Sequence, residues 1–345
     1  MMKILKLVPA AAAAAFIFPA FAHAEAKSIY GDDNRLDYYQ ASPAMRKLAD
    51  SVVSLWPSAQ LLSSGSGYKL ATIGFGDALN LCPGEQFREQ PIGAFCSGTL
   101  VGEDIIMTAG HCITDETKCA DTKFVFGFNI DAEGGKARTS VESKDVYGCK
   151  KIIKRDLDKE YPGIFGFALN IIKALLNKAG PDYALVQLDR KVTDRAPLEI
   201  NRKRNLKEGA PIFVIGHPVG LPVKIAGDAK VRDKGHRAWF STDLDTFGGN
   251  SGSAVFNANT NLIEGILVRG GTDFVSSPAG CKTQLRSGQD EGKGEAVTKI
   301  AMLKRHIPKL GSDKNADEPE ELEVVDMQVG EVSAPGEDLA GRIQF

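Results

Sequence analysis

The chain has 345 residues, a formal net charge of −2 at pH 7, 43% hydrophobic residues and six cysteines. This length allows one large or two modest domains. The charge is uneven, because residues 313–345 carry ten acids against two bases, which leaves about +4 on residues 25–312. A mildly basic body gives no reason to expect a nucleic-acid partner. The sequence has no CxxC, HExxH or Walker-type motif, so we expect neither a metal site nor a cofactor.

The N-terminus has the composition of a secretory signal. Lys3 and Lys6 precede an apolar, alanine-rich run over residues 7–21, and residues 22–24 fit a small-x-small cleavage site. The apolar run has about 15 residues, fewer than the roughly 20 needed to span a bilayer. We therefore expect residues 1–24 to be removed on export. The mature protein is expected to be secreted or periplasmic, without stable membrane insertion.

Residues 25–68 form the next region, which is polar and rich in turn residues at its start. Residues 44–55 predict a short helix that runs into a strand. Residues 63–67, Ser-Ser-Gly-Ser-Gly, have the composition of a linker. The region is therefore either a propeptide or an N-terminal arm packed on the rest of the protein.

Residues 69–310 have the pattern of an all-β protein. Short apolar segments bounded by Gly, Pro and Asp are typical of strands in a β-barrel. A terminal helix is predicted at 297–306. Strands are predicted at 95–101, 105–108, 124–128, 182–188, 211–215, 254–256 and 262–268.

Residues 164–176 interrupt this β pattern. They read as a helix that is apolar apart from one narrow polar stripe, and such a helix must bury most of its surface. One interpretation makes it a surface helix packed on the predicted β-barrel structure. The other makes it a hydrophobic lid or partner-docking element near Asp182. The last segment, 311–345, is acidic, has few aromatic residues and is expected to be disordered.

Three separate segments carry candidate catalytic residues. His111 follows the strand at 105–108, and Asp182 opens an apolar strand, where a buried acid needs a partner such as a His ring. Ser251 lies in Gly-Gly-Asn-Ser-Gly-Ser, residues 248–253, whose glycines let the backbone turn tightly and bring amide N–H groups close to a substrate. The order His, Asp, Ser is that of the chymotrypsin-type triad, whereas the α/β-hydrolase order is Ser, Asp, His.

At these segments, and at Ile215-Gly216-His217-Pro218, the sequence resembles the chymotrypsin-like serine peptidases. Within that family it resembles the bacterial branch of glutamyl endopeptidases and their trypsin-like relatives. The resemblance covers roughly residues 70–310. It implies two six-stranded antiparallel β-barrels, an active site between them and a C-terminal helix.

The resemblance also implies a role for each candidate residue. His111 would be the general base, Asp182 would orient it, and Ser251 would be the nucleophile. The N–H groups of Gly249 and Ser251 would form the oxyanion hole. Asn250 stands where animal members of the family have an acid that pairs with a new N-terminus, so activation by that salt bridge is not expected.

The six cysteines are disulfide candidates in an exported protein. The resemblance pairs Cys96 with Cys112, and closing a loop of this length is worth about 3 kcal/mol in the chain-entropy model. The other four cysteines allow three pairings, which the sequence does not order. They are Cys82, Cys119, Cys149 and Cys281.

In this family the base of the primary specificity pocket lies six residues before the nucleophile, which here is Asp245. An acid there would select a substrate Arg or Lys, because a buried carboxylate needs a cation to offset its desolvation. Residues 266–269 lack the His of the glutamyl branch, but Arg269 could neutralise Asp245 or hold an acidic substrate side chain. Alternatively, Asp245 faces solvent or caps a turn.

The sequence therefore predicts a secreted serine endopeptidase that acts on proteins or peptides and cleaves after Arg or Lys. One alternative keeps this fold but selects Glu or Asp. Another is a non-catalytic binding protein on a peptidase fold, although such proteins usually lose a triad residue. An esterase could use the same acyl chemistry, but the triad order and its contexts disfavour it.

Overall fold

The structure is a computed structural model that describes residues 29–157, 180–203, 205–292 and 294–311. Three sequence predictions lie outside the described residues: the signal at 1–24, the apolar helix at 164–176 and the acidic tail from 312 onward. No helix in the described part of the chain is long and apolar enough to cross a membrane. Both barrels belong to one unit that ends at Leu310.

Six antiparallel strands close into a first barrel in the order β10-β12-β13-β9-β8-β3. Every second side chain of a strand points to the same face. Leu55, Ile106, Phe124 and Leu185 are fully buried in this way and fill the core. The strands are β3 (Val52–Pro57), β8 (Cys96–Gly102), β9 (Ile105–Thr108), β10 (Thr122–Phe126), β12 (Val146–Leu157) and β13 (Asp182–Leu188).

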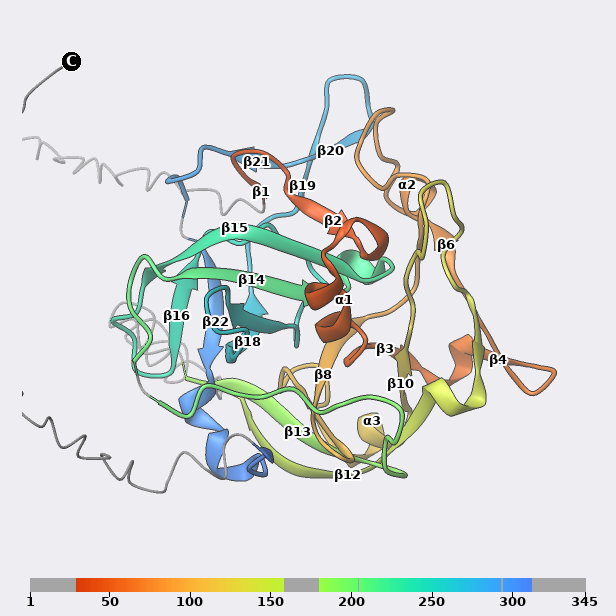
Figure 1. The fold of residues 1–345 in the computed structure, drawn as a ribbon. Helices are drawn as coiled ribbons and strands as arrows, with labels where there is room; N and C mark the ends of the chain where they lie inside the picture. The colour runs from red at the N-terminus through yellow and green to blue at the C-terminus, as the bar shows by residue number, and fades with distance from the viewer. Residues whose placement is uncertain (1–28, 158–179, 204, 293, 312–345) are drawn as a thin grey trace, which may run out of the picture. The chain divides into compact units, whose positions relative to one another are not determined.

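A second six-stranded barrel follows the order β14-β17-β18-β22-β16-β15 and closes through the pairing of β14 with β15. Figure 1 shows β12 and β13 of the first barrel at the bottom of the view and β15 of the second in its upper half. The predicted pair of six-stranded antiparallel barrels is thus confirmed. The strands are β14 (Pro211–Gly216), β15 (Lys224–Asp233), β16 (Trp239–Thr242), β17 (Ala254–Asn257), β18 (Ile263–Arg269) and β22 (Glu295–Lys299).

The N-terminal segment attaches to the second barrel. β2 (Arg35–Asp37) pairs with β15 as an added edge strand, and β1 (Ile29–Tyr30) pairs in parallel with β21 (Arg286–Ser287). The short helix α1 (Pro43–Ala49) follows. It begins there because the Ser42 side chain accepts a hydrogen bond from the Met45 N–H and because proline suits the first helical position.

The remaining elements are short. Within the described residues they comprise two helices, six 3-10 turns and strands outside the barrels. The helices are α2 (Phe75–Leu79) and α3 (Glu116–Ala120), and the turns are Tyr38–Gln40, Ser58–Gln60, Ser143–Asp145, Pro218–Gly220, Ile300–Met302 and Lys304–His306. The strands are β4 (Leu61–Ser64), β5 (Gly67–Leu70), β6 (Ile73–Gly74), β7 (Pro91–Ile92), β11 (Ser140–Glu142), β19 (Phe274–Ser276) and β20 (Lys282–Gln284).

Three sequence expectations need correction. Residues 63–67 are no linker, because they form the end of β4, a two-residue turn and the start of β5 in one hairpin. The boundary at 68 cuts through the first barrel, since β3 lies before it. The terminal helix expected at 297–306 is replaced by β22 and two 3-10 turns. Val297 is fully buried between Phe240 of β16 and Leu267 of β18, so the sheet pairing outweighs the local helix preference.

All six cysteines are paired. The predicted bond between Cys96 and Cys112 is confirmed and links β8 to the residue after His111. Of the three pairings left open for the other cysteines, the structure selects one, consisting of Cys82–Cys281 and Cys119–Cys149.

Candidate active site

The pairing of two neighbouring strands brings His111 and Asp182 together. β13 begins at Asp182 and runs antiparallel to β9, with Ala184 opposite Thr108, so the residues just beyond β9 face the start of β13. The Nδ1 atom of His111 lies 2.8 Å from Oδ2 of Asp182. In the neutral imidazole, the Nδ1–H donates to this carboxylate and Nε2 is left as the basic nitrogen.

Asp182 is held through both its carboxylate and its backbone. Its Oδ1 atom accepts hydrogen bonds from the N–H groups of Gly110 at 2.6 Å and of His111 at 3.2 Å. The Thr298 hydroxyl on β22 accepts from the Asp182 N–H and donates to the Asp182 carbonyl. Position 110 must be glycine, because a Cβ there would lie 2.7 Å from the carbonyl oxygen of Asp156. The acid and the imidazole ring are therefore fixed in one relative position.

Ser251 lies in the loop before β17, and its backbone connects the two barrels. The Ser251 carbonyl accepts from the N–H of Ser97 on β8 at 2.9 Å, and the Gly252 N–H donates to Leu267 of β18 at 2.8 Å. Gly252 has a φ of +92°, and a Cβ there would lie 2.0 Å from the Ser97 carbonyl oxygen. Glycine at this position thus allows the second barrel to bring Ser251 against the first, where His111 lies.

The turn around Ser251 leaves two N–H groups available. Gly249 has a φ of +86°, and neither its N–H nor that of Ser251 donates a hydrogen bond within the described part of the chain. Asn250 is buried, and its Oδ1 accepts from the Ser253 hydroxyl at 3.0 Å. The turn is therefore held locally by Asn250, while these two N–H groups have no acceptor within the described part of the chain.

His217 is a buried structural residue. Its ring Nδ1–H donates to the Leu221 carbonyl at 2.9 Å, and its backbone N–H donates to the Ser97 hydroxyl at 2.9 Å. Burial lowers the pKa of His217 to about 3, so its ring stays neutral. It supports Ser97, the residue that contacts the Ser251 carbonyl.

A cavity of about 190 Å³ opens beside Ser251. Arg269 lines it, and the Arg269 guanidinium donates to the Gly180 carbonyl at 3.4 Å. Sequence reasoning missed Glu295, an acid at the start of β22 that also lines the cavity. The full lining is Thr246, Phe247, Gly248, Ser251, Leu267, Arg269, Gly270, Gly271, Asp273 and Glu295.

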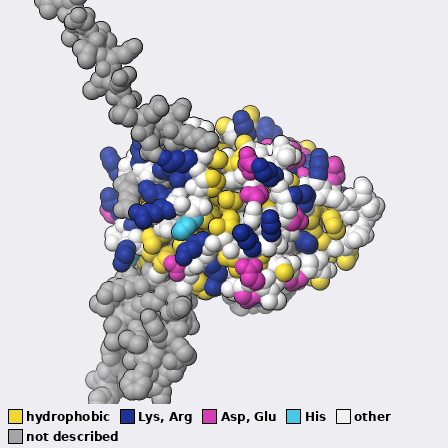
Figure 2. Space-filling model, turned by 90° about the horizontal axis from the view of Figure 1, so that it is seen from below, with side chains coloured by type: hydrophobic (Ala, Val, Ile, Leu, Met, Phe, Trp, Pro, Cys, Tyr) yellow, Lys and Arg dark blue, Asp and Glu magenta, His cyan; other side chains and the backbone are white. Residues whose placement is uncertain are grey.

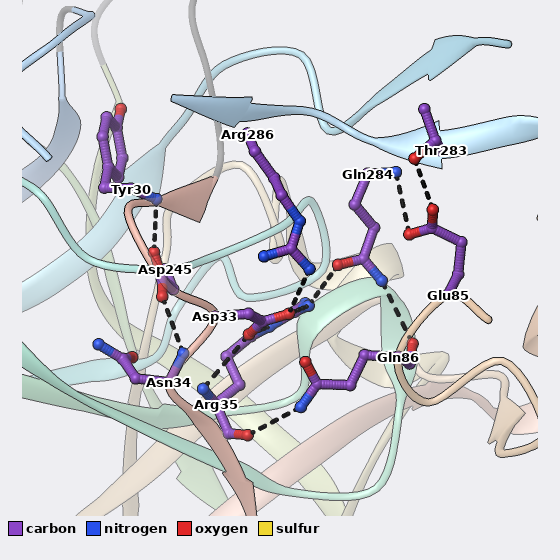
Figure 3. Close-up of polar contacts among 10 residues, drawn as sticks. All are labelled: Tyr30, Asp33, Asn34, Arg35, Glu85, Gln86, Asp245, Thr283, Gln284 and Arg286. Carbon is purple, nitrogen blue, oxygen red and sulfur yellow. Dashed lines mark hydrogen bonds and ion pairs between the residues drawn. The ribbon is translucent and has the colours of Figure 1, made fainter. Parts of the chain in front are cut away.

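Asp245, expected at the base of the specificity pocket, has a different position. It is 1% exposed and does not line the cavity, because its carboxylate turns toward the N-terminal segment. Its oxygens accept from the N–H groups of Tyr30 at 2.7 Å and Asn34 at 3.2 Å (Figure 3). Burial raises the pKa of Asp245 to about 6 despite these two hydrogen bonds. Both oxygens are occupied within the protein, which corrects the assignment of Asp245 to substrate binding.

The same N-terminal segment contacts the loop that leads to Ser251. The Arg35 guanidinium is buried, pairs with Asp33 at 2.6 and 2.8 Å and donates to Gln284 at 2.7 Å (Figure 3). It also stacks on Phe247, 4.1 Å from the ring centre. Phe247 lines the cavity, so residues 29–37 support one wall of the candidate site.

A possible metal-ligand cluster and a second cavity do not add residues to this candidate site. The side chains of Cys96, His111 and Cys112 cluster within 4.8 Å, but the two sulfurs form a disulfide and are not thiolate ligands for a metal.

Lys and Arg side chains gather around hydrophobic ones on the face shown in Figure 2. A separate cavity of about 580 Å³ contains none of the three candidate catalytic residues. Its cationic lining residues are Lys203, Lys234, Arg237, Lys299 and Arg305.

Comparison with known proteins adds a family match. Residues 96–266 match the family model of the trypsin-like peptidase domain. No curated protein sequence matches the chain.

Among solved structures, Vibrio cholerae VesB protease is similar at 15% identity and a TM-score of 0.46, over 79% of this chain and 66% of VesB. The chain thus spans just under two thirds of the length of VesB. A Glu endopeptidase in complex with MPD is similar at 15% identity and a TM-score of 0.42, over 81% of this chain and 96% of that one.

Proposed function

We propose that the chain is a serine endopeptidase using Ser251, His111 and Asp182, and the match of residues 96–266 to the trypsin-like peptidase domain supports this. The observation that carries the proposal is the 2.8 Å contact between His111 Nδ1 and the buried Asp182 carboxylate, beside a Ser251 held against the same barrel. The three disulfides support a secreted or periplasmic location, because disulfides persist in oxidising compartments.

The proposed reaction is acyl transfer. Ser251 Oγ attacks the peptide carbonyl while His111 Nε2 takes its proton, and His111 then returns that proton to the leaving amine. Asp182 fixes the tautomer and stabilises the imidazolium. The N–H groups of Gly249 and Ser251 would stabilise the oxyanion, which is often among the largest contributions to catalysis. A water molecule then hydrolyses the acyl-enzyme by the same steps.

We propose cleavage after Arg or Lys. Two carboxylates, Glu295 and Asp273, line the cavity beside Ser251 against one cation, Arg269. Selection of Glu or Asp is the second candidate, and the presence of Arg269 in the lining favours it. The hydrogen bond from the Arg269 guanidinium to the Gly180 carbonyl counts against it, because that bond directs the cation to the protein backbone.

Peptide hydrolysis by single-site variants tests the mechanism. Ser251→Ala should reduce kcat to the residual level supplied by binding and the oxyanion hole, roughly 10³–10⁴-fold over water. Ser66→Ala, in the exposed turn of the β4–β5 hairpin, is the matched control and should retain full activity. Near-normal hydrolysis by Ser251→Ala would contradict the proposal. A wild-type protein that folds and binds peptides without cleaving them would favour a non-catalytic binding protein.

A further inference from the structure

Glu295 is a buried acid in the wall of the cavity beside Ser251. The residue is only 2% exposed and lies at the start of β22. Oε2 accepts a hydrogen bond from the Thr246 hydroxyl at 2.8 Å, and the Gly271 backbone N–H also lies close enough to lower the pKa of the carboxyl, whereas Oε1 is buried and makes no hydrogen bond of normal geometry among the described residues. A buried carboxylate oxygen without a partner loses its hydration without replacement, which is costly.

The surroundings of Glu295 add negative charge. Asp273 lines the same cavity, and its Oδ2 accepts from the Gly248 N–H at 2.7 Å. Burial raises the pKa of the Glu295 carboxyl well above its usual range, and the nearby charge of Asp273 raises it further. Within the described residues, no Lys or Arg forms an ion pair with Glu295. Glu295 is therefore not ion-paired, and the guanidinium of Arg269, which lines the same cavity, donates to the Gly180 carbonyl instead.

Gly270 packs directly against this carboxylate. A Cβ at position 270 would lie 2.1 Å from Oε2 and 3.1 Å from Oε1 of Glu295. Any larger residue would therefore clash with the carboxylate. Gly270, Glu295 and Ser251 line the same cavity, so the carboxylate lies in the wall of the space beside the nucleophile.

We propose that Glu295, and not Asp245, selects the substrate by binding the cationic side chain of a Lys or Arg residue in this cavity. The proposal rests on the proposed peptidase function of Ser251. A cation beside Oε1 gives that oxygen its missing partner and offsets the repulsion from Asp273. A neutral side chain would leave the buried carboxylate unpaired or force it to take up a proton. The selecting acid thus lies on the strand beside β18 rather than in the loop before the nucleophile.

The first test compares peptides that differ only at the residue before the cleaved bond, namely Lys, Arg, Glu and norleucine. Norleucine resembles the Lys stem without its charge. Glu295→Gln keeps the size of the side chain and lets Thr246 still donate to an oxygen. This variant should lose on the order of 100-fold in kcat/KM for Lys and Arg peptides and less than about threefold for norleucine.

Glu264→Gln is the matched control. Glu264 is also a buried acid, on β18, but its oxygens accept from Asn201 and Asn257, and it does not line the cavity beside Ser251. This variant should leave the ratio of Lys to norleucine cleavage unchanged. An unchanged ratio in Glu295→Gln, or no preference of the wild-type protein for Lys and Arg, would overturn the proposal.

The second test measures binding without catalysis. Ser251→Ala protein is titrated by calorimetry with benzamidine, a cation, and with benzamide, its neutral counterpart. Benzamidine should bind, and adding Glu295→Gln should weaken it about 100-fold, whereas benzamide should bind poorly to both proteins. Equal affinities for the two probes would overturn the proposal. Benzamidine binding that depends on Glu295, in a protein whose wild type cleaves no peptide, would retain the cation site and reject only the peptidase function.

Discussion

The difference in unfolding free energy between Asp245→Asn and the wild-type protein should shift in favour of the variant as the pH rises from 4 to 7. The pKa of Asp245 is raised from 3.8 to about 6 by burial, against the lowering effect of two backbone hydrogen bonds. The folded protein therefore holds this proton more tightly than the unfolded chain does. The associated stability is fully present below about pH 3.8 and is lost as the pH rises through about 6.

The size of this effect follows from the pKa shift. A shift of about two pKa units corresponds to about 3 kcal/mol. Asparagine has the shape of the protonated acid and does not titrate. The difference in unfolding free energy between the variant and wild type should therefore change by about 2 kcal/mol in favour of the variant between pH 4 and pH 7, because part of the total is already lost at pH 4.

Urea unfolding at several pH values measures this difference, with Ser251→Ala in both proteins to prevent self-cleavage. Asp131→Asn is the control, because Asp131 is an exposed partner of Arg138 and surface ion pairs contribute about 0–1 kcal/mol. A difference that stays constant with pH, or that grows in favour of wild type, would refute the reasoning. It would mean that the N–H groups of Tyr30 and Asn34 stabilise the charged carboxylate by more than burial destabilises it.

Two further substitutions test the backbone and the N-terminal segment. Gly252→Ala should destabilise by roughly 3 kcal/mol or more, because its Cβ would lie 2.0 Å from the Ser97 carbonyl at a φ of +92°. Gly65→Ala, at a φ of +57° with open space, should cost only about 1 kcal/mol, and equal losses in urea unfolding would contradict this. Arg35→Met should cost about 3–5 kcal/mol in the same assay, because Asp33 is left as a buried charge without its closest cation. A loss below about 1 kcal/mol would show that the Arg35 network does not fix the segment.

Local patterns predicted much of the fold. The strands at 105–108 and 182–188 have the predicted bounds, because each is an apolar run closed by turn residues. The prediction of a helix running into a strand is met by α1 and β3. The contact between His111 and Asp182 was also expected, since it depends on the pairing of two strands that the sequence marks clearly.

The features that the sequence did not predict depend on contacts between residues far apart in the chain. Asp245 had a definite place in the family pattern, but Tyr30, 215 residues away in the chain, takes one oxygen of its carboxylate. Glu295 was overlooked because the following residues resemble a helix. Its place in the cavity follows only from the pairing of β22 with β18. Similarly, β3 was assigned to an arm or propeptide because nothing local shows that it completes the first barrel.

The most direct measurement of the central claim is the location of a covalent adduct. The protein is treated with a fluorophosphonate, and the labelled peptide is identified by mass spectrometry. We predict a single adduct on Ser251 that disappears in His111→Ala and persists in Glu295→Gln, because the base activates the nucleophile whereas Glu295 acts on the substrate side chain. Absence of an adduct in the folded wild-type protein, or an adduct on another serine, would contradict the account.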